Sequence, residues 1–347
     1  SLIITSNSWL YTYAHDLNGG TPKITAASAF IAKGGGIIAD ARGYRAREGP
    51  GTQPAYGLYN GGGGHGGRGG SGSDPIVGGF PYGSVDQPIT AGSGGSGHSD
   101  HYKGAGPGGG CIRLEVTGTL SVRGVISANG GSSYSSYGGG GAGGGIYLKC
   151  HTLDASNAII RANGANSYGS TYGGSGGGGR IAVDYQVLGA NKNVSFSASP
   201  GEVGWAYADR NNRWRHLPGL GSLSLPDTAL LTNPLTDKFA DGVCLYFTRT
   251  NTWRVGNLVV TNSSLSFAEN GFKVHVTNDL IIGAGGEFGI GGDPSGTGYV
   301  LTCGGNIILT NNGIMTIYAG LTNLLTSSWG AFVAATNDFI VYAGSKV

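Results

Sequence analysis

The densest group of side chains that could do chemistry lies at residues 98–103, HSDHYK. A lyase acting on a uronic-acid polysaccharide needs a cation to neutralise the carboxylate, a base for the C5 proton and an acid for the leaving oxygen. His101, Tyr102 and Lys103 are residue types that fill these roles. Because consecutive loop residues seldom converge on one point, the alternative is a polar tip on a glycine-rich loop. The cluster predicts either a catalytic group or such a tip.

A second candidate is an aromatic and basic patch. Flat aromatic rings stack on sugar rings, and arginines beside them pair with carboxylates or sulfates. We therefore predict a glycan-binding patch made of Trp205, Tyr207, Arg210, Arg213, Trp214, Arg215 and His216. The alternative is a structural junction with the two tryptophans as plugs. A third basic group, Arg42, Arg45, Arg47 and Glu48, is most simply a solvated turn.

One motif bears on metal binding. Residues 69–77, GGSGSDPIV, match the nine-residue pattern GGxGxDxUx, which binds calcium in tandem β-rolls. Those sites need a neighbouring repeat, and this match occurs once, so a calcium ligand at Asp74 is weighed against a chance match. We expect no cofactor, with calcium as the one alternative.

The spacing of the cysteines argues against a zinc site. Cys111, Cys150, Cys244 and Cys303 have neither CxxC nor Cys/His spacing. A disulfide stays open, and the alternative at Cys150 is a buried thiol that acts as a small hydrophobe.

Composition excludes several classes of protein. Of 347 residues 71 are glycine, about three times the ordinary share, which excludes an average enzyme fold. The 21 Lys and Arg nearly balance the 19 Asp and Glu, so we expect no nucleic-acid partner. The sequence has no apolar run of about 20 residues and no basic-then-apolar leader, so we expect no membrane span and a mature or trimmed chain.

The elements that would position these groups follow from internal repeats. IRLEV, TLSV and VISANGG, from Ile112, recur from Ile146 as IYLKC, HTLDAS and IIRANGA, and more loosely from Ile181. In each first strand apolar residues alternate on one face, which predicts three strands and a glycine-rich loop per repeat. In-register stacking would give an outward column of Glu115, Lys149 and Asp184.

Turns are predicted at asparagines. Asn129 and Asn163 each precede a glycine after the third strand, and Asn-Gly tolerates positive φ, so we expect the chain to turn there at small steric cost. In the C-terminal half GNLVV, NDLII, GNIIL and NDFIV predict successive coils, each with an Asx side chain bonded to the backbone two residues on. The Asx residues are Asn257, Asp279, Asn306 and Asp338. The predicted fold is all-β, a parallel β-helix (β-solenoid).

The glycine runs recur at one phase of the repeat. They lie at residues 61–72, 92–97, 104–110, 138–145 and 173–179. We expect them to pack as extended, polyglycine-II-like rods whose N–H and C=O groups pair, provided that these groups are shielded from water. For the long insertion, residues 49–110, a flexible loop is the alternative.

These segments carry a resemblance. The stretches beginning at Gly34, Gly108, Gly143 and Gly176 resemble the glycine-rich β-helix repeats of very large secreted surface proteins of environmental bacteria, over roughly residues 25–190. The resemblance implies an extracellular β-solenoid and supplies no catalytic residue. We expect a glycine-rich solenoid at residues 1–200, a junction at 201–222 and further coils at 223–347.

The function expected is structural or adhesive, at the cell surface or in the secreted fraction. The last residues, DFIVYAGSKV, read as a strand without a cap, so we expect either a longer parent chain or end-to-end stacking into fibres. The alternatives are a polysaccharide lyase using Lys103 or Arg215, and a glycan-binding module using the Trp205 patch.

Overall fold

The computed structural model describes residues 1–53, 60–72, 77–97, 104–135, 137–168, 173–202, 217–267, 269, 271–292, 299–318 and 331–347. These residues form strands, turns and extended segments, with no helix among them. The chain divides into two compact units, Ser1–Ser224 and Leu225–Val347, and each is described here by itself. The predicted junction at 201–222 falls largely on residues 203–216, outside the described part.

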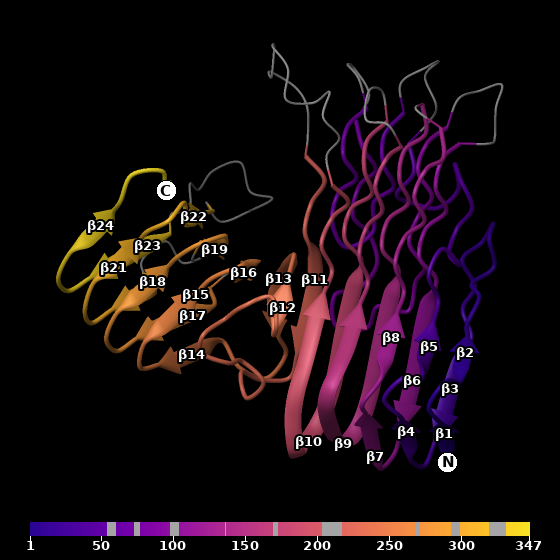
Figure 1. Ribbon diagram of the computed structural model, residues 1–347, viewed down its shortest axis with the longest axis horizontal. Coiled ribbons are helices and arrows are strands. Elements are labelled where there is room, and N and C mark those ends of the chain that lie inside the picture. The colour runs from indigo at the N-terminus through magenta and orange to yellow at the C-terminus, as the bar shows by residue number, and fades with distance from the viewer. Residues whose placement is uncertain are drawn as a thin grey trace. The chain divides into compact units, whose positions relative to one another are not determined.

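The first unit is a parallel stack of strands through which the chain passes repeatedly (Figure 1). We call one passage a rung. Its strands are β1 (Leu2–Ile4), β2 (Trp9–Tyr11), β3 (Lys23–Ala26), β4 (Ala29–Ile31), β5 (Gly36–Ile38), β6 (Cys111–Val116), β7 (Thr119–Val122), β8 (Val125–Ser127), β9 (Gly145–Arg161), β10 (Arg180–Ser197) and the start of β11 (Gly221–Leu225).

The predicted register is confirmed. Ile112 pairs with Ile146, which pairs with Ile181, and all three are fully buried. Glu115 lies opposite Lys149 and Lys149 opposite Asp184, so the outward charged column forms as expected. The alternation of apolar and polar residues therefore fixes which face of each strand enters the core.

The division of each repeat into three strands holds for only one of the compared rungs. β6, β7 and β8 are separate, whereas β9 runs unbroken for 17 residues and pairs with each of them in turn. Gly118 and Gly124 stand at the breaks between β6, β7 and β8, and the interior of β9 has no glycine. β9 turns at Asn157, whose φ is +50°, and β10 is likewise unbroken although it contains Gly189.

The expectation of positive φ at the asparagine turns is wrong. Asn129 and Asn163 do not adopt it, nor do the glycines that follow them. Instead their side chains link rungs, because Asn129 Oδ1 accepts from the N–H of Asn163 at 2.8 Å and Asn163 Oδ1 accepts from the N–H of Ser199 at 2.9 Å. Asp40 begins this ladder by accepting from the N–H of Asn129 at 2.7 Å. The turn is held by the neighbouring rung and not by its own local conformation.

The glycine runs of the first unit pack against one another as extended segments, and those at 104–110, 138–145 and 173–179 lead into β6, β9 and β10 (Figure 1). Successive residues of one run bond to different segments: Gly62 N–H donates to Gly70, later in the same run, Gly63 N–H to Gly140 of another run and Gly64 N–H to Gly51, each at 2.8–2.9 Å. Residues 60–65 are all buried. The described parts of the insertion at 49–110 are therefore packed, and the flexible-loop alternative does not hold for them.

At several positions of this bundle only glycine fits. A Cβ on Gly62 would lie 1.9 Å from the carbonyl oxygen of Ser175, and one on Gly141 would lie 1.9 Å from that of Pro107. These distances are well below van der Waals contact, and the obstacle is main chain, which cannot rotate away. The composition of the runs is thus imposed by the spacing of the segments.

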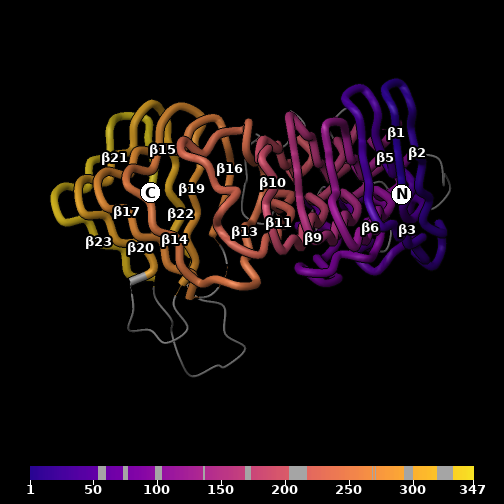
Figure 2. The backbone as a smooth tube through the Cα atoms, turned by 90° about the horizontal axis from the view of Figure 1, so that it is seen from below, coloured from indigo at the N-terminus to yellow at the C-terminus, as the bar shows by residue number. Residues whose placement is uncertain are grey.

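The second unit repeats a rung of three strands. The stacks in order are β13 (Val243–Phe247), β16 (Ser263–Phe267), β19 (Gly286–Ile290) and β22 (Ile314–Ile317); β14 (Thr252–Val255), β17 (Lys273–Val276), β20 (Tyr299–Cys303) and β23 (Phe332–Ala335); and β15 (Leu258–Val260), β18 (Leu280–Ile282), β21 (Ile307–Leu309) and β24 (Phe339–Val341). A further short strand, β12 (Ala240–Asp241), precedes them. Figure 2 shows the turns of this unit as successive loops.

The stack of β15, β18, β21 and β24 confirms that the repeated GNLVV-type segments lie on successive rungs. The prediction that their Asx side chains bond the backbone two residues on is wrong. Asp279 Oδ1 accepts from the N–H of Asn306 at 2.7 Å, and Asn306 Oδ1 accepts from the N–H of Asp338 at 3.2 Å. A second ladder between rungs results, because the parallel register places each side chain beside the next rung's amide.

Candidate functional site

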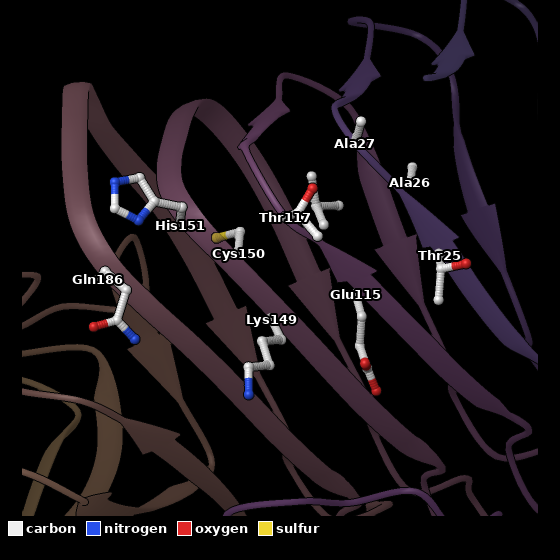
Figure 3. A pocket seen from close by; sticks show the side chains of 10 residues that line it. Thr25, Ala26, Ala27, Glu115, Thr117, Lys149, Cys150, His151 and Gln186 are labelled. Atoms are coloured by element: carbon white, nitrogen blue, oxygen red, sulfur yellow. The ribbon is translucent and has the colours of Figure 1, made fainter.

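A groove of about 640 Å³ lies on the outer face of the first unit (Figure 3). Four strands supply its walls. Its lining residues are Thr25, Ala26 and Ala27 at the end of β3, Glu115, Val116 and Thr117 at the end of β6, Lys149, Cys150 and His151 on β9, and Gln186 on β10. The groove lies where β6 ends and β9 bends. At this point the His151 N–H of β9 donates to the carbonyl oxygen of Gly118 at 3.1 Å.

Glu115 is the most strongly held side chain of the groove. Lys23 Nζ lies 2.7 Å from its Oε2, and Arg113 Nη2 lies 2.8 Å from its Oε1. The hydrogen bond from Lys23, and then that from Arg113, lower the pKa of this carboxyl below its usual value. Glu115 is therefore ionised at neutral pH and accepts hydrogen bonds, so it is poorly suited to act as a general acid.

Lys149 completes the chemistry of the groove, since Cys150 is buried on the inward face of β9. In Figure 3 the side chains of Lys149 and Glu115 extend side by side from neighbouring strands. Lys149 Nζ lies 3.8 Å from Asp184 Oδ2. Burial, and then the charge of Asp184, raise the pKa of Cys150 to about 12, so its thiol stays protonated and is not a nucleophile. The groove offers donors and acceptors for a polar ligand and no activated nucleophile among these residues.

The four cysteines are free thiols, so none is joined in a disulfide. Cys150 is buried on the inward face of β9, as its position in the repeat predicts.

A buried polar cluster lies within the glycine bundle. His65 is fully buried; its Nδ1 lies 2.9 Å from the carbonyl oxygen of Gly143, and its Nε2 lies 3.0 Å from Thr90 Oγ1. A carbonyl only accepts, so Nδ1 carries the proton and Nε2 accepts from the Thr90 hydroxyl. Burial, and then the charge of Arg180, lower the pKa of His65 to about 3. Arg180 Nε donates to the carbonyl of Tyr82 at 2.7 Å.

This cluster ties the insertion to the strands and is structural. Sequence reasoning missed it: the signals were a histidine inside one run of glycines and an arginine directly after another, and nothing in the runs indicated their partners. Part of the groove could be predicted from the sequence, because the outward column of Glu115, Lys149 and Asp184 was expected. That column was interpreted as fixing the strand register and not as a binding surface.

The residues that the sequence singled out for catalysis, calcium binding and glycan binding lie outside the described part of the chain. This holds for Asp74, for His101, Tyr102 and Lys103, and for Trp205, Tyr207, Arg210, Arg213, Trp214, Arg215 and His216. The lyase, calcium and glycan-patch hypotheses on those residues therefore stay predictions. Within the described ranges, no group of His, Cys, Asp and Glu side chains could hold a metal ion, and no helix could cross a membrane.

No family model, curated protein or solved structure matches the chain.

Proposed function

We propose that this chain is a rigid structural segment of an extracellular surface protein: a parallel β-helix reinforced by a polyglycine-II-like bundle. The observation that carries the proposal is the bundle itself. Its main-chain groups bond in several directions to separate runs, and side chains are excluded by contacts as short as 1.6 Å between a Cβ placed on Gly79 and the carbonyl of Gly51.

The energetic argument favours stiffness. Ordering glycine costs more backbone entropy than ordering any other residue, roughly 0.5–1 kcal/mol more than alanine for each position. A chain that orders so many glycines needs buried, mutually bonded amides to offset that cost, and buried main-chain bonds open only when their neighbours open too. Such a bundle resists local opening and therefore proteolysis, which suits an exposed scaffold. The extracellular location rests on the resemblance to secreted glycine-rich repeat proteins.

Hydrogen exchange with mass spectrometry tests the scaffold role. We expect peptides covering residues 60–67 and 138–144 to exchange as slowly as peptides from β9. Exchange within seconds at pH 7, the behaviour of a flexible glycine linker, would overturn the proposal.

Negative-stain electron microscopy over a concentration series tests self-association. Ordered fibres that lengthen with concentration would support end-to-end stacking. Isolated particles of single-chain size at every concentration would remove self-association from the proposal, while slow exchange of the glycine amides would still support the scaffold role.

A further inference from the structure

A row of aromatic side chains stands on the outer face of the first unit, away from the groove residues. Trp9, Tyr11 and Tyr13 alternate along β2 and its extension with inward Leu10 and Thr12. Their exposed fractions are 45%, 50% and 63%. Alternate residues of a strand are about 6.7 Å apart, so the rings form a straight, evenly spaced strip.

The strip is held in place from beneath and from the side. Trp9 lies over the main chain of its strand partner Gly36, where a Cβ would come within 2.9 Å of the indole ring. The Arg42 guanidinium stacks on both tyrosines, 4.6 Å from the ring centre of Tyr11 and 4.8 Å from that of Tyr13. The expectation that Arg42 belongs to a solvated turn is therefore wrong, because its side chain is half-buried against the two rings.

The charges on this face favour an anionic ligand. Arg42 Nη1 donates to the main-chain oxygen of Asp40 at 2.8 Å, while the Asp40 carboxylate accepts from Ser127 Oγ and from the N–H of Asn129. Arg161 is exposed on the same face, three strands from Tyr11 through Ile38 and Ser127, a separation of about 14 Å. Both cations thus lie on the side of the aromatic row where β5, β8 and β9 follow β2, and the Asp40 carboxylate is already engaged by Ser127 and Asn129.

We propose that this face, formed by Trp9, Tyr11, Tyr13, Arg42 and Arg161, binds an acidic polysaccharide. Aromatic rings pack against the apolar faces of sugar rings, and guanidinium groups pair with carboxylate or sulfate groups on the same chain. An extended polymer matches a straight strip, since each ring face can meet a successive aromatic side chain. The site does not rest on the proposed scaffold role, and it uses residues other than the predicted Trp205 patch.

Affinity gel electrophoresis of the whole chain tests this site. The gels contain polygalacturonate, dextran sulfate or neutral dextran, which separate carboxylate, sulfate and uncharged sugar chains. We expect retardation by at least one acidic polymer and not by neutral dextran, with Tyr11→Ala and Arg42→Lys each weakening binding about tenfold. Arg42→Lys keeps the charge and loses the planar stacking surface.

The matched control is Tyr134→Ala, which removes a tyrosine with the same exposed fraction as Tyr13, 63%, from a glycine-rich segment outside the strip. Circular dichroism melting checks that each variant folds, and Tyr13→Ala, at the most exposed ring, replaces any variant that does not. No retardation by either acidic polymer, equal retardation by neutral dextran, or equal loss with Tyr134→Ala would overturn the proposal. Loss of binding with unchanged glycine exchange would leave the scaffold role intact.

Discussion

Asn129 Oδ1 accepts a hydrogen bond from the main-chain N–H of Asn163, 34 residues later, at 2.8 Å. The sequence repeat has the same spacing, so this hydrogen bond fixes the position of the next rung relative to Asn129. Because Asn163 Oδ1 then accepts from Ser199 N–H and from Ser197 Oγ, the contact continues across a further rung. A repeat that carries its own acceptor resists slipping by one residue.

Removing a member of this ladder is expected to destabilise the first unit. Asn163→Ala leaves the Ser199 N–H without its acceptor, and we expect a loss of about 1–2 kcal/mol in the free energy of unfolding, measured with urea. Asn163→Asp keeps the accepting oxygen, as Asp40 does in the ladder, and is expected to retain most of the stability. The exposed Asn193→Ala is the control. Equal effects of Asn163→Ala and Asn193→Ala would show that the ladder contributes nothing.

A single methyl group in the glycine bundle is expected to have a large effect. A Cβ on Gly63 would lie 2.3 Å from the carbonyl oxygen of Ser93, so Gly63→Ala forces segments apart and is expected to cost about 2–3 kcal/mol or to prevent folding. A Cβ on Gly256 meets nothing within 4 Å, so Gly256→Ala is expected to be neutral or slightly stabilising. Thermal melts of both variants decide the matter, and similar melting temperatures would contradict the packing described for the bundle.

The free energy of unfolding is expected to decrease as pH is lowered, because His65 has a lower pKa in the folded chain than in the unfolded chain. Its pKa is about 3 in the folded chain and about 6.5 when unfolded, so the unfolded state binds the proton first as pH falls. The stabilisation is complete above pH 6.5 and is lost as pH drops toward 3. Between pH 6.5 and 5, where most carboxyl groups stay ionised, the loss from this residue is about 2 kcal/mol.

Urea unfolding of the wild type and of His65→Gln at pH 6.5 and pH 5 measures this loss of unfolding free energy. The variant is expected to be less stable at pH 6.5 and to lose less stability on acidification. Burial also lowers the pKa of His275, in the second unit, and that contribution cancels in the comparison. Equal pH dependence of the two proteins would mean that His65 is not the group that titrates.

The outward charge column is expected to be sensitive to the sign at its centre. Lys149→Glu would place a third carboxylate between those of Glu115 and Asp184 on adjacent strands, and we expect a cost of about 0.5–1 kcal/mol because these groups are partly exposed. Adding Asp184→Lys restores one opposite pair and part of the stability. Chemical denaturation with urea at 0.05 M and 0.5 M NaCl checks this, since salt should shrink the difference; Lys192→Glu, at an exposed site of β10, is the control.

The sequence by itself determined the rungs. Alternating apolar residues at Ile112, Ile146 and Ile181 predicted the inward face and the register, because a slip by one residue would turn every one of them outward. The Asn and Asp residues predicted where the chain turns, although not how. Their bonds run to the next rung, a choice that local turn preferences do not contain.

The tertiary structure alone decided which glycine runs are neighbours and which side chains they enclose. A glycine has no side chain to give a run a face or a register, so nothing in the residue types selects Gly140 as the acceptor for the N–H of Gly63; the three-dimensional packing of the runs does. The same is true of Arg42, which is far from Tyr11 in sequence and reaches it only because β5 lies beside β2. Contacts between residues that are far apart in sequence depend on how the rungs stack, and residue types alone do not predict them. The buried His65 cluster and the aromatic strip both consist of such contacts.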